Sequence, residues 1–153
     1  MSGPFTKLHH LCVVVADIDR AQRFYESAGI GPWVDYPPLE DYTDLDVPDP
    51  DGFRALKYRY AWVGGLQLQL CEPGPEPSPQ RQFLDERGEG VFHVGFEVPD
   101  IEAAVRGLGA AGVEMLRYPH FQQDALGVWT APSGARVCWF ADPDGNVISL
   151  SQF

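Results

Sequence analysis

The chain has 153 residues, 44% of them hydrophobic and 22% charged, which is typical of a single globular domain with a buried core. Its 22 acidic side chains outnumber the 11 lysines and arginines, so we expect neither a nucleic-acid partner nor an anionic membrane surface, because both require clustered cations. No apolar run approaches the roughly 20 residues that span a bilayer, and no signal-peptide core follows the N-terminus, so we expect a cytoplasmic protein.

The first predicted elements are a strand and a helix. Residues 8–15 (LHHLCVVV) are apolar and rich in β-branched side chains, which favours a buried strand. Asp17 stands where a carboxylate would accept from the free N–H groups of a first helical turn. Apolar side chains then recur at helical spacing as far as Ala28, and Gly29 can take the left-handed conformation that ends a helix.

A hairpin and a linker follow. Residues 53–63 and 66–71 are predicted to be antiparallel strands, because the Gly64-Gly65 pair between them suits a two-residue turn. Residues 73–90 begin with alternating prolines that cannot continue a central strand, so this segment is interpreted as a stiff linker.

The second half of the chain repeats the first. Residues 10–21 align with residues 93–104 without a gap, at a constant offset of 83, and the register persists to the helix ends. Strands are expected again at 91–98, 128–130, 136–140 and 147–152. We therefore predict an α+β fold of two tandem βαβββ modules, 8–72 and 91–153, that form a curved mixed sheet around a cavity within a single domain, 1–153.

The repeat brings polar residues into equivalent positions. Leucines and glutamines alternate over residues 66–70, so Gln67 and Gln69 share the face opposite the apolar one. The matching strand near the C-terminus places Ser149 at the position of Gln69. His10 and His93 are equivalent on the two first strands, and two imidazoles with an amide oxygen could bind a borderline divalent cation. The alternative is that each histidine is a hydrogen-bonded core residue.

These residues resemble the vicinal oxygen chelate superfamily, which includes glyoxalases, epimerases, extradiol dioxygenases and bleomycin-resistance binding proteins. The resemblance covers nearly the whole chain and is nearest to the methylmalonyl-CoA-epimerase-like branch. It implies that His10, Gln69 and His93 bind a divalent metal ion such as zinc, cobalt, nickel or manganese, with His9 a non-ligand, and that the protein is a homodimer. The motifs that carry it are LHHLCVVV (8–15), AGIGPW (28–33), LQLQLCEP (66–73), FHVGFEV (92–98) and DPDGNVISLSQ (142–152).

The chain departs from this family pattern at two positions. Ser149 stands where the resemblance implies a glutamate ligand, and Ala55 appears where epimerase-like members carry a base. Neither a hydroxyl nor a methyl group replaces a carboxylate, so we expect neither two-base epimerisation of a coenzyme A thioester nor extradiol dioxygenase chemistry.

Three residues are candidates for the missing catalytic group: Glu97, which shares the face of His93, and Asp41 and His120 in loop-like segments. The alternative for each is an exposed side chain without a chemical role. Gln67 and an alternating set on the preceding strand are candidate substrate-binding residues, with the opposite strand orientation also open. That set consists of Arg54, Tyr58, Tyr60 and Trp62.

The expected function is that of a metal-dependent isomerase or lyase acting on a small carbonyl or acyl compound. The alternative is a non-catalytic protein that binds or sequesters a small molecule and retains a degenerate metal site. The odd number of cysteines, without a C-x-x-C spacing, indicates reduced and buried thiols.

Overall fold

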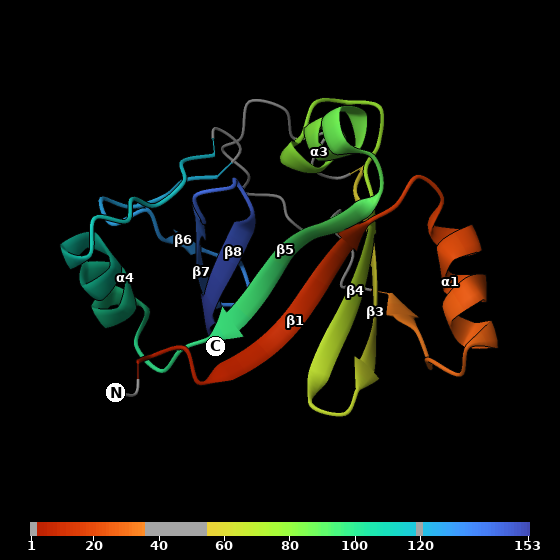
Figure 1. Ribbon diagram of the computed structural model, residues 1–153, viewed down its shortest axis with the longest axis horizontal. Helices are drawn as coiled ribbons and strands as arrows, with labels where there is room; N and C mark the ends of the chain where they lie inside the picture. The colour runs from red at the N-terminus through yellow and green to blue at the C-terminus, as the bar shows by residue number, and fades with distance from the viewer. Residues whose placement is uncertain (1–2, 36–54, 119–120) are drawn as a thin grey trace.

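The computed structural model describes residues 3–35, 55–118 and 121–153. These residues form one eight-stranded sheet in the order β2-β3-β4-β1-β5-β8-β7-β6, with β1 parallel to β4, β5 parallel to β8, and the other pairs antiparallel (Figure 1). The predicted α+β class with a mixed sheet is therefore confirmed. The elements are β1 (Lys7–Val14), α1 (Ile18–Ser27), β2 (Val34–Asp35), β3 (Lys57–Val63), β4 (Leu66–Glu72), α3 (Pro79–Arg87), β5 (Gly90–Glu97), α4 (Ile101–Ala110), β6 (Trp129–Thr130), β7 (Arg136–Ala141) and β8 (Val147–Gln152).

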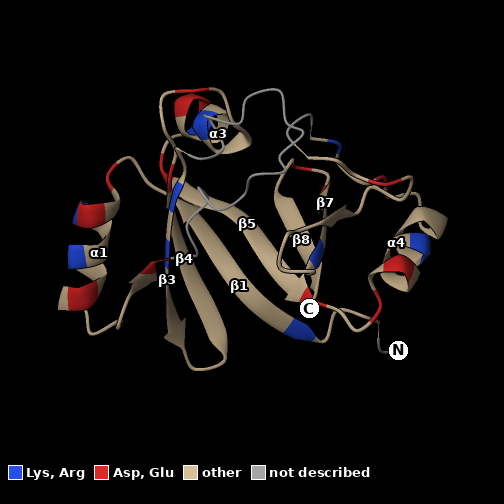
Figure 2. Cartoon of the chain, turned by 180° about the vertical axis from the view of Figure 1, so that it is seen from behind, with Lys and Arg blue, Asp and Glu red and all other residues tan. Residues whose placement is uncertain are grey.

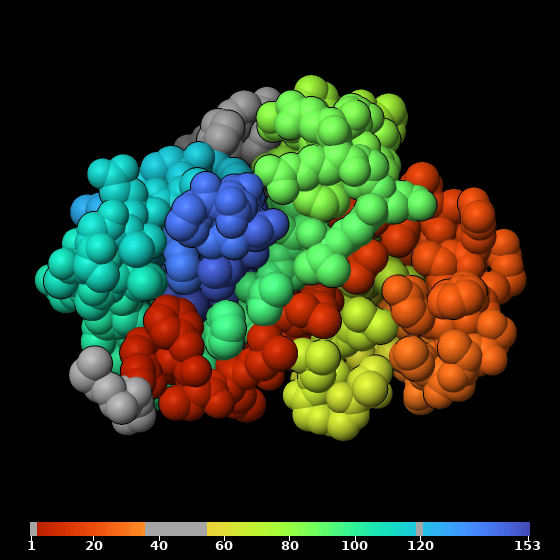
Figure 3. All heavy atoms as spheres, viewed as in Figure 1, coloured from red at the N-terminus to blue at the C-terminus, as the bar shows by residue number. Residues whose placement is uncertain are grey.

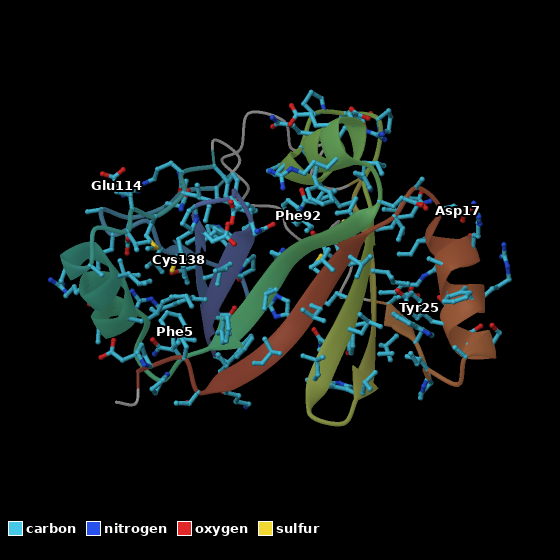
Figure 4. All side chains as sticks on the ribbon, in the orientation of Figure 1. Phe5, Asp17, Tyr25, Phe92, Glu114 and Cys138 are labelled. Atoms are coloured by element: carbon cyan, nitrogen blue, oxygen red, sulfur yellow. The ribbon has the colours of Figure 1, made fainter. Side chains whose placement is uncertain are left out.

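Helices α1 and α4 cover the same face of the sheet at its two ends. In the first half, Ile18 of α1 packs on Leu70 of β4, and Tyr25 points from α1 toward the sheet (Figure 4). In the second half, Ile101 of α4 packs in one cluster with Leu150 of β8. These contacts remove apolar surface from water, which is the main stabilising contribution of each helix.

The opposite face is covered by α3 at one end. Phe83 of α3 packs against a core cluster that includes Cys12 of β1 and Cys71 of β4, and Phe92 lies beneath the helix (Figure 4). The remainder of this face carries His10 and His93 and is called the histidine face below. All three cysteines of the chain are buried and free.

The two halves begin their helices with the same contacts. Asp17 accepts a hydrogen bond from the backbone of α1, as Asp100 does from the backbone of α4, so the predicted caps are confirmed. A side chain of the last strand of each half adds a second bond. Glu72 accepts from the N–H of Ile18 at 2.8 Å, and Gln152 accepts from the N–H of Ile101 at 2.9 Å.

The structure differs from the predicted elements in two places. Residues 73–90 contain the helix α3, which begins because Ser78 caps it and Pro79 occupies its first turn, a position where proline needs no N–H partner. Strand β3 begins at Lys57, later than the predicted strand start; residues 53 and 54 lie outside the described residues.

Charged side chains gather on the helices and connecting loops, while much of β1, β4, β5 and β8 carries none (Figure 2). Several form surface ion pairs, among them Arg59 with Asp19 at 2.7 Å and Lys57 with Glu72 at 3.4 Å. Strands β1 and β5 cross the middle of the molecule side by side between its two halves (Figure 3). None of the helices in the described ranges is both long and apolar enough to cross a membrane.

Candidate functional site

The candidate site lies on the histidine face, where six strands place their side chains in one row. Residues opposite each other on neighbouring strands share a face, so the strand register identifies the members of the row. From β3 to β7, the row consists of Trp62, Gln67, His10, Gly95, Ser149 and Trp139. His93 belongs to the adjacent row, opposite Cys12. The two histidines that are distant in sequence thus meet at the centre of the sheet.

The imidazoles of His10 and His93 touch through their Nε2 atoms, which lie 2.8 Å apart. His10 is 6% exposed and His93 is 9% exposed. Burial, reinforced by the neighbouring imidazoles, lowers the pKa of His10 to about 2, and burial lowers the pKa of His93 to about 4. Both rings are therefore neutral near pH 7, the form in which an imidazole nitrogen can bind a metal ion.

Gly95 leaves the space that the His10 ring occupies. A Cβ atom at position 95 would lie 2.0 Å from Cε1 of His10 and 2.3 Å from its Nε2. Sequence reasoning missed this residue as part of the site. The available signal was a glycine in the interior of a predicted strand, which often marks a close approach of another group.

The two glutamines form a buried pair beside His10. Gln69 donates from its amide nitrogen to the amide oxygen of Gln67 at 2.6 Å, and both side chains are buried. Because the nitrogen of Gln69 is used in this bond, its carbonyl oxygen is the atom that could ligate a cation. The structure thus places Gln69 on the same face as both histidines, as the alternation of residues 66–70 predicted.

The site contains no carboxylate in its row. Ser149, which is 2% exposed, lies opposite Gly95 and brings only a hydroxyl. Glu97 is on the same strand as His93, but its carboxylate pairs with Lys7 at 2.6 Å. Across the described part of the chain, no group of three histidine, cysteine, aspartate or glutamate side chains could hold a metal ion. The donor set for a cation is therefore neutral.

The aromatic members of the predicted substrate-binding set lie in two environments. Trp62 is half exposed, and its ring lies 5.9 Å from that of His9, at the edge of the site. Tyr60 packs beside Trp62 and lies opposite Gln69. Tyr58 instead packs beneath α3, where its hydroxyl accepts from Gln80 at 2.7 Å. Three other candidates, Arg54, Asp41 and His120, lie outside the described residues.

A second aromatic cluster lies at the other end of the row and was not predicted. Phe121 stacks on Trp139 with ring centroids 5.0 Å apart, and Trp129 and Tyr118 pack against the same pair. Trp139 is opposite Ser149, so this cluster borders the histidine face. The sequence offered only isolated aromatic residues in a loop and in two strands, with no period to unite them.

A surface groove with a volume of about 640 Å³ lies away from the imidazoles. It runs between α3 and the segment that contains Arg117 and Tyr118. Arg81 in its wall pairs with Asp85, and Arg117 donates to the backbone oxygens of Asp124 and Ala125. Both cations in its wall are therefore already engaged within the described part of the chain.

Known proteins resemble this chain in sequence and in fold. The family model for the Glyoxalase/Bleomycin resistance protein/Dioxygenase superfamily matches residues 9–131. The mitochondrial methylmalonyl-CoA epimerase of Bos taurus is 28% identical over 111 residues, which are 72% of this chain and 57% of the epimerase. A 3-dehydroshikimate dehydratase of Pseudomonas aeruginosa is 29% identical over 114 residues, which are 71% of this chain and 18% of that enzyme.

A solved structure has the same fold. The crystal structure of methylmalonyl-CoA epimerase from Mycobacterium tuberculosis matches with a TM-score of 0.71 at 24% identity, over 99% of this chain and 91% of that one. The chain spans about half the length of the curated bovine epimerase and less than a fifth of the dehydratase. Positions 55 and 149 of this chain are nonetheless alanine and serine, so neither carries a carboxylate.

Proposed function

The chain belongs to the glyoxalase/bleomycin resistance protein/dioxygenase superfamily, and we propose that His10, Gln69 and His93 hold a divalent metal ion in it. The observation that carries this proposal is the 2.8 Å approach of two buried, neutral imidazole nitrogens from strands 83 residues apart. Zinc, cobalt, nickel and manganese all suit imidazole or amide donors. The amide oxygen of Gln69 completes three neutral ligands.

The proposed activity is the isomerisation or elimination of a small carbonyl or acyl compound. A bound divalent ion would polarise a substrate carbonyl, so that an adjacent C–H or C–O bond can break. The chain's own residues supply the geometry. The neutral rings of His10 and His93 each have one unprotonated nitrogen at pH 7, Ser149 leaves the neighbouring position to substrate or water, and the buried face limits access of bulk solvent.

The proposed reaction removes a proton from the substrate, which requires a base. Among the residues that the structure describes, Glu97 is the candidate, and it could act only if its carboxylate left its ion pair with Lys7. Asp41 and His120 remain candidates from outside the described residues. We propose that Gln67, Tyr60 and Trp62 contact the substrate, because they lie in or beside the row that contains the imidazoles. Tyr58 and Arg54 remain candidates with them.

The second candidate function is non-catalytic binding of a small molecule, as in bleomycin-resistance members. The neutral donor set favours it, because a carboxylate normally adds both charge and affinity to a divalent site. A protein with this function would bind its ligand on the histidine face without turnover, and metal would be weakly held or absent.

Metal analysis tests the first proposal. Untagged protein purified without chelator should contain about one divalent ion per chain, or take one up from zinc, cobalt, nickel or manganese. His10→Ala and His93→Ala should each lose it, whereas His120→Ala, which removes a histidine outside the proposed ligand set, should retain it. Binding that survives both ligand substitutions would refute the assignment.

Activity is tested separately by proton exchange. Candidate carbonyl compounds are incubated in D₂O with metal-loaded protein, and loss of their α-proton signals is followed by NMR. Exchange that disappears in His93→Ala supports the enzyme. Tight ligand binding without exchange or elimination supports the binding protein.

We also propose that the chain forms a cytoplasmic homodimer, as the family resemblance implies. Light scattering coupled to gel filtration tests the oligomeric state, and a mass near 17.0 kDa would exclude the dimer.

A further inference from the structure

Both imidazoles of the candidate site lie next to a break in the strand register. One shift falls between Leu8 and His10 on β1, and the other lies at Phe92 on β5, where Cys12 pairs with His93 and Val13 pairs with Val91. Neighbouring side chains on a regular strand point to opposite faces, but a bulge lets both lie on one face. Each histidine therefore has an aromatic ring beside it.

The two bulges are equivalent in the internal repeat. The rings of His9 and His10 have centroids 5.2 Å apart and an interplanar angle of 87°, and those of Phe92 and His93 are 5.3 Å apart at 71°. The same local geometry thus occurs twice with different chemistry. Position 9 carries an imidazole, and position 92 carries a phenyl ring without a hydrogen-bonding atom.

This difference decides what happens to the Nδ1 atom of each site histidine. Nδ1 of His10 lies 2.9 Å from Nδ1 of His9, in hydrogen-bond contact. Nδ1 of His93 is buried and has no hydrogen-bond partner among the residues that the structure describes. Phe92 occupies the position equivalent to His9, and its phenyl ring has no nitrogen that could form a hydrogen bond with Nδ1 of His93.

The contacts allow two proton arrangements along the three imidazoles. With His10 neutral, its single proton lies on either Nδ1 or Nε2. If the proton is on Nε2, His10 donates to Nε2 of His93, whose own proton must then lie on the buried and unpartnered Nδ1. If the proton is on Nδ1, His10 donates to His9, and His93 donates from Nε2 to Nε2 of His10.

Only the second arrangement gives an acceptor to every buried ring N–H. Nδ1 of His93 is unpartnered in both arrangements, but a buried N–H without an acceptor is rarer in proteins than a buried lone pair without a donor, so the second arrangement is favoured. It leaves Nε2 of His10 without a proton, so that this atom accepts the hydrogen bond from Nε2–H of His93. The ring of His9 is itself held in place, because it packs on the rings of Phe153 and Trp62, with centroid distances of 4.8 Å and 5.9 Å.

We infer that His9 is a positioning residue, which accepts a hydrogen bond from Nδ1–H of His10 and so keeps Nε2 of His10 unprotonated, the state in which this atom can bind a metal ion. The tautomer part of this inference stands on the hydrogen bonds alone. Its consequence for metal affinity rests on the proposed function. Groups that orient a ligand histidine typically alter metal affinity by 10- to 100-fold.

Two substitutions of His9 separate its nitrogen from its bulk. His9→Phe reproduces the Phe92–His93 arrangement, keeping an aromatic ring but removing the acceptor. His9→Asn keeps an acceptor oxygen near the position of Nδ1 and removes the ring. Circular dichroism and thermal unfolding establish that each variant is folded before its site is compared.

The first readout is the tautomer of His10 in metal-free protein, from long-range ¹H–¹⁵N correlation spectra of the labelled side chains. We expect the Nδ1–H form in the native chain and in His9→Asn, and a loss of that preference in His9→Phe. An Nε2–H form of His10 in the native protein, or an unchanged spectrum in His9→Phe, would overturn the inference.

The second readout is zinc or cobalt affinity, measured by competition with a chelator. His9→Phe should bind at least tenfold more weakly, and His9→Asn should recover most of the native affinity. Equal affinity in all three proteins contradicts the role in metal binding. If the native chain binds no metal while the tautomer responds as expected, the proposed function fails and the positioning role of His9 stands.

Discussion

The imidazole of His10 occupies the volume that a side chain on Gly95 would fill, across the antiparallel pair of β1 and β5. We therefore predict that Gly95→Ala displaces the ring and separates its Nε2 from that of His93. A Cβ atom 2.0 Å from a ring carbon cannot be accommodated without movement. Metal or ligand affinity should fall by at least tenfold, and unfolding should occur at a lower temperature.

Gly90 on the same strand provides the matched control for this substitution. A Cβ atom at position 90 would meet no atom within 4 Å, so Gly90→Ala should leave affinity and thermal stability near those of the native chain. If the two variants behave alike in binding and in unfolding, the close packing of His10 on Gly95 has no functional consequence.

The buried imidazoles also make stability depend on pH. The pKa values of about 2 for His10 and about 4 for His93 lie below the value near 6.5 of an unfolded chain, which therefore binds more protons between these limits. The histidine contribution is fully present above pH 6.5 and is lost as the pH falls. As the pH falls from 6.5 toward the pKa of each ring in the folded protein, that imidazole lowers the free energy of unfolding by about 1.4 kcal/mol per pH unit.

Urea denaturation of metal-free protein between pH 7.5 and 4.5 measures this dependence. Carboxylates add their own change in the acidic part of the range, so the double variant His10→Gln, His93→Gln isolates the imidazole part. Its slope between pH 6.5 and 5 should be shallower than that of the native chain. Identical slopes would mean that the folded protein protonates these rings as readily as the unfolded chain does.

Gln152 provides a test of how the second half is held together. Its side-chain oxygen accepts from the N–H of Ile101, a residue with no exposed surface, so Gln152→Ala leaves a buried donor without a partner. The free energy of unfolding should fall by about 1–3 kcal/mol. Gln152→Glu keeps an acceptor and should lose less. Chemical denaturation that places both variants at the native value would show that this bond contributes nothing.

The internal repeat carried most of the fold prediction. An N-cap aspartate, a helix-ending glycine and an alternating strand are local signals, and their recurrence at a constant offset predicted both halves together. The equivalent positions of His10 and His93 followed from the same offset, and their contact at 2.8 Å agrees with it. Helix α3 was missed because its prolines dominated the interpretation, although Ser78 and Pro79 are themselves helix-start signals.

The features of the site that were missed depend on register between strands. Gly95 matters only because β1 lies antiparallel to β5 with His10 opposite it, and no local pattern states that pairing. The bulges at His9 and Phe92 shift side chains between faces without changing the apolar pattern. The effect of the two bulges on the histidines could be recognised only from the positions of the ring nitrogens.

The final prediction concerns the missing charge at Ser149. This buried residue lies opposite Gly95, on the face where the His10 ring rests, so a glutamate there would bring a carboxylate to the neutral donors. Ser149→Glu should raise zinc or cobalt affinity by at least tenfold. Without metal it should unfold at a lower temperature than the native chain, because a buried carboxylate without a partner is unfavourable.

Ser149→Gln has nearly the same size without the charge and should show neither effect. Chelator competition and thermal unfolding with and without metal measure both. If Ser149→Glu binds metal no more tightly than Ser149→Gln, then position 149 does not face the ion, and the ligand set proposed for His10, Gln69 and His93 must be revised.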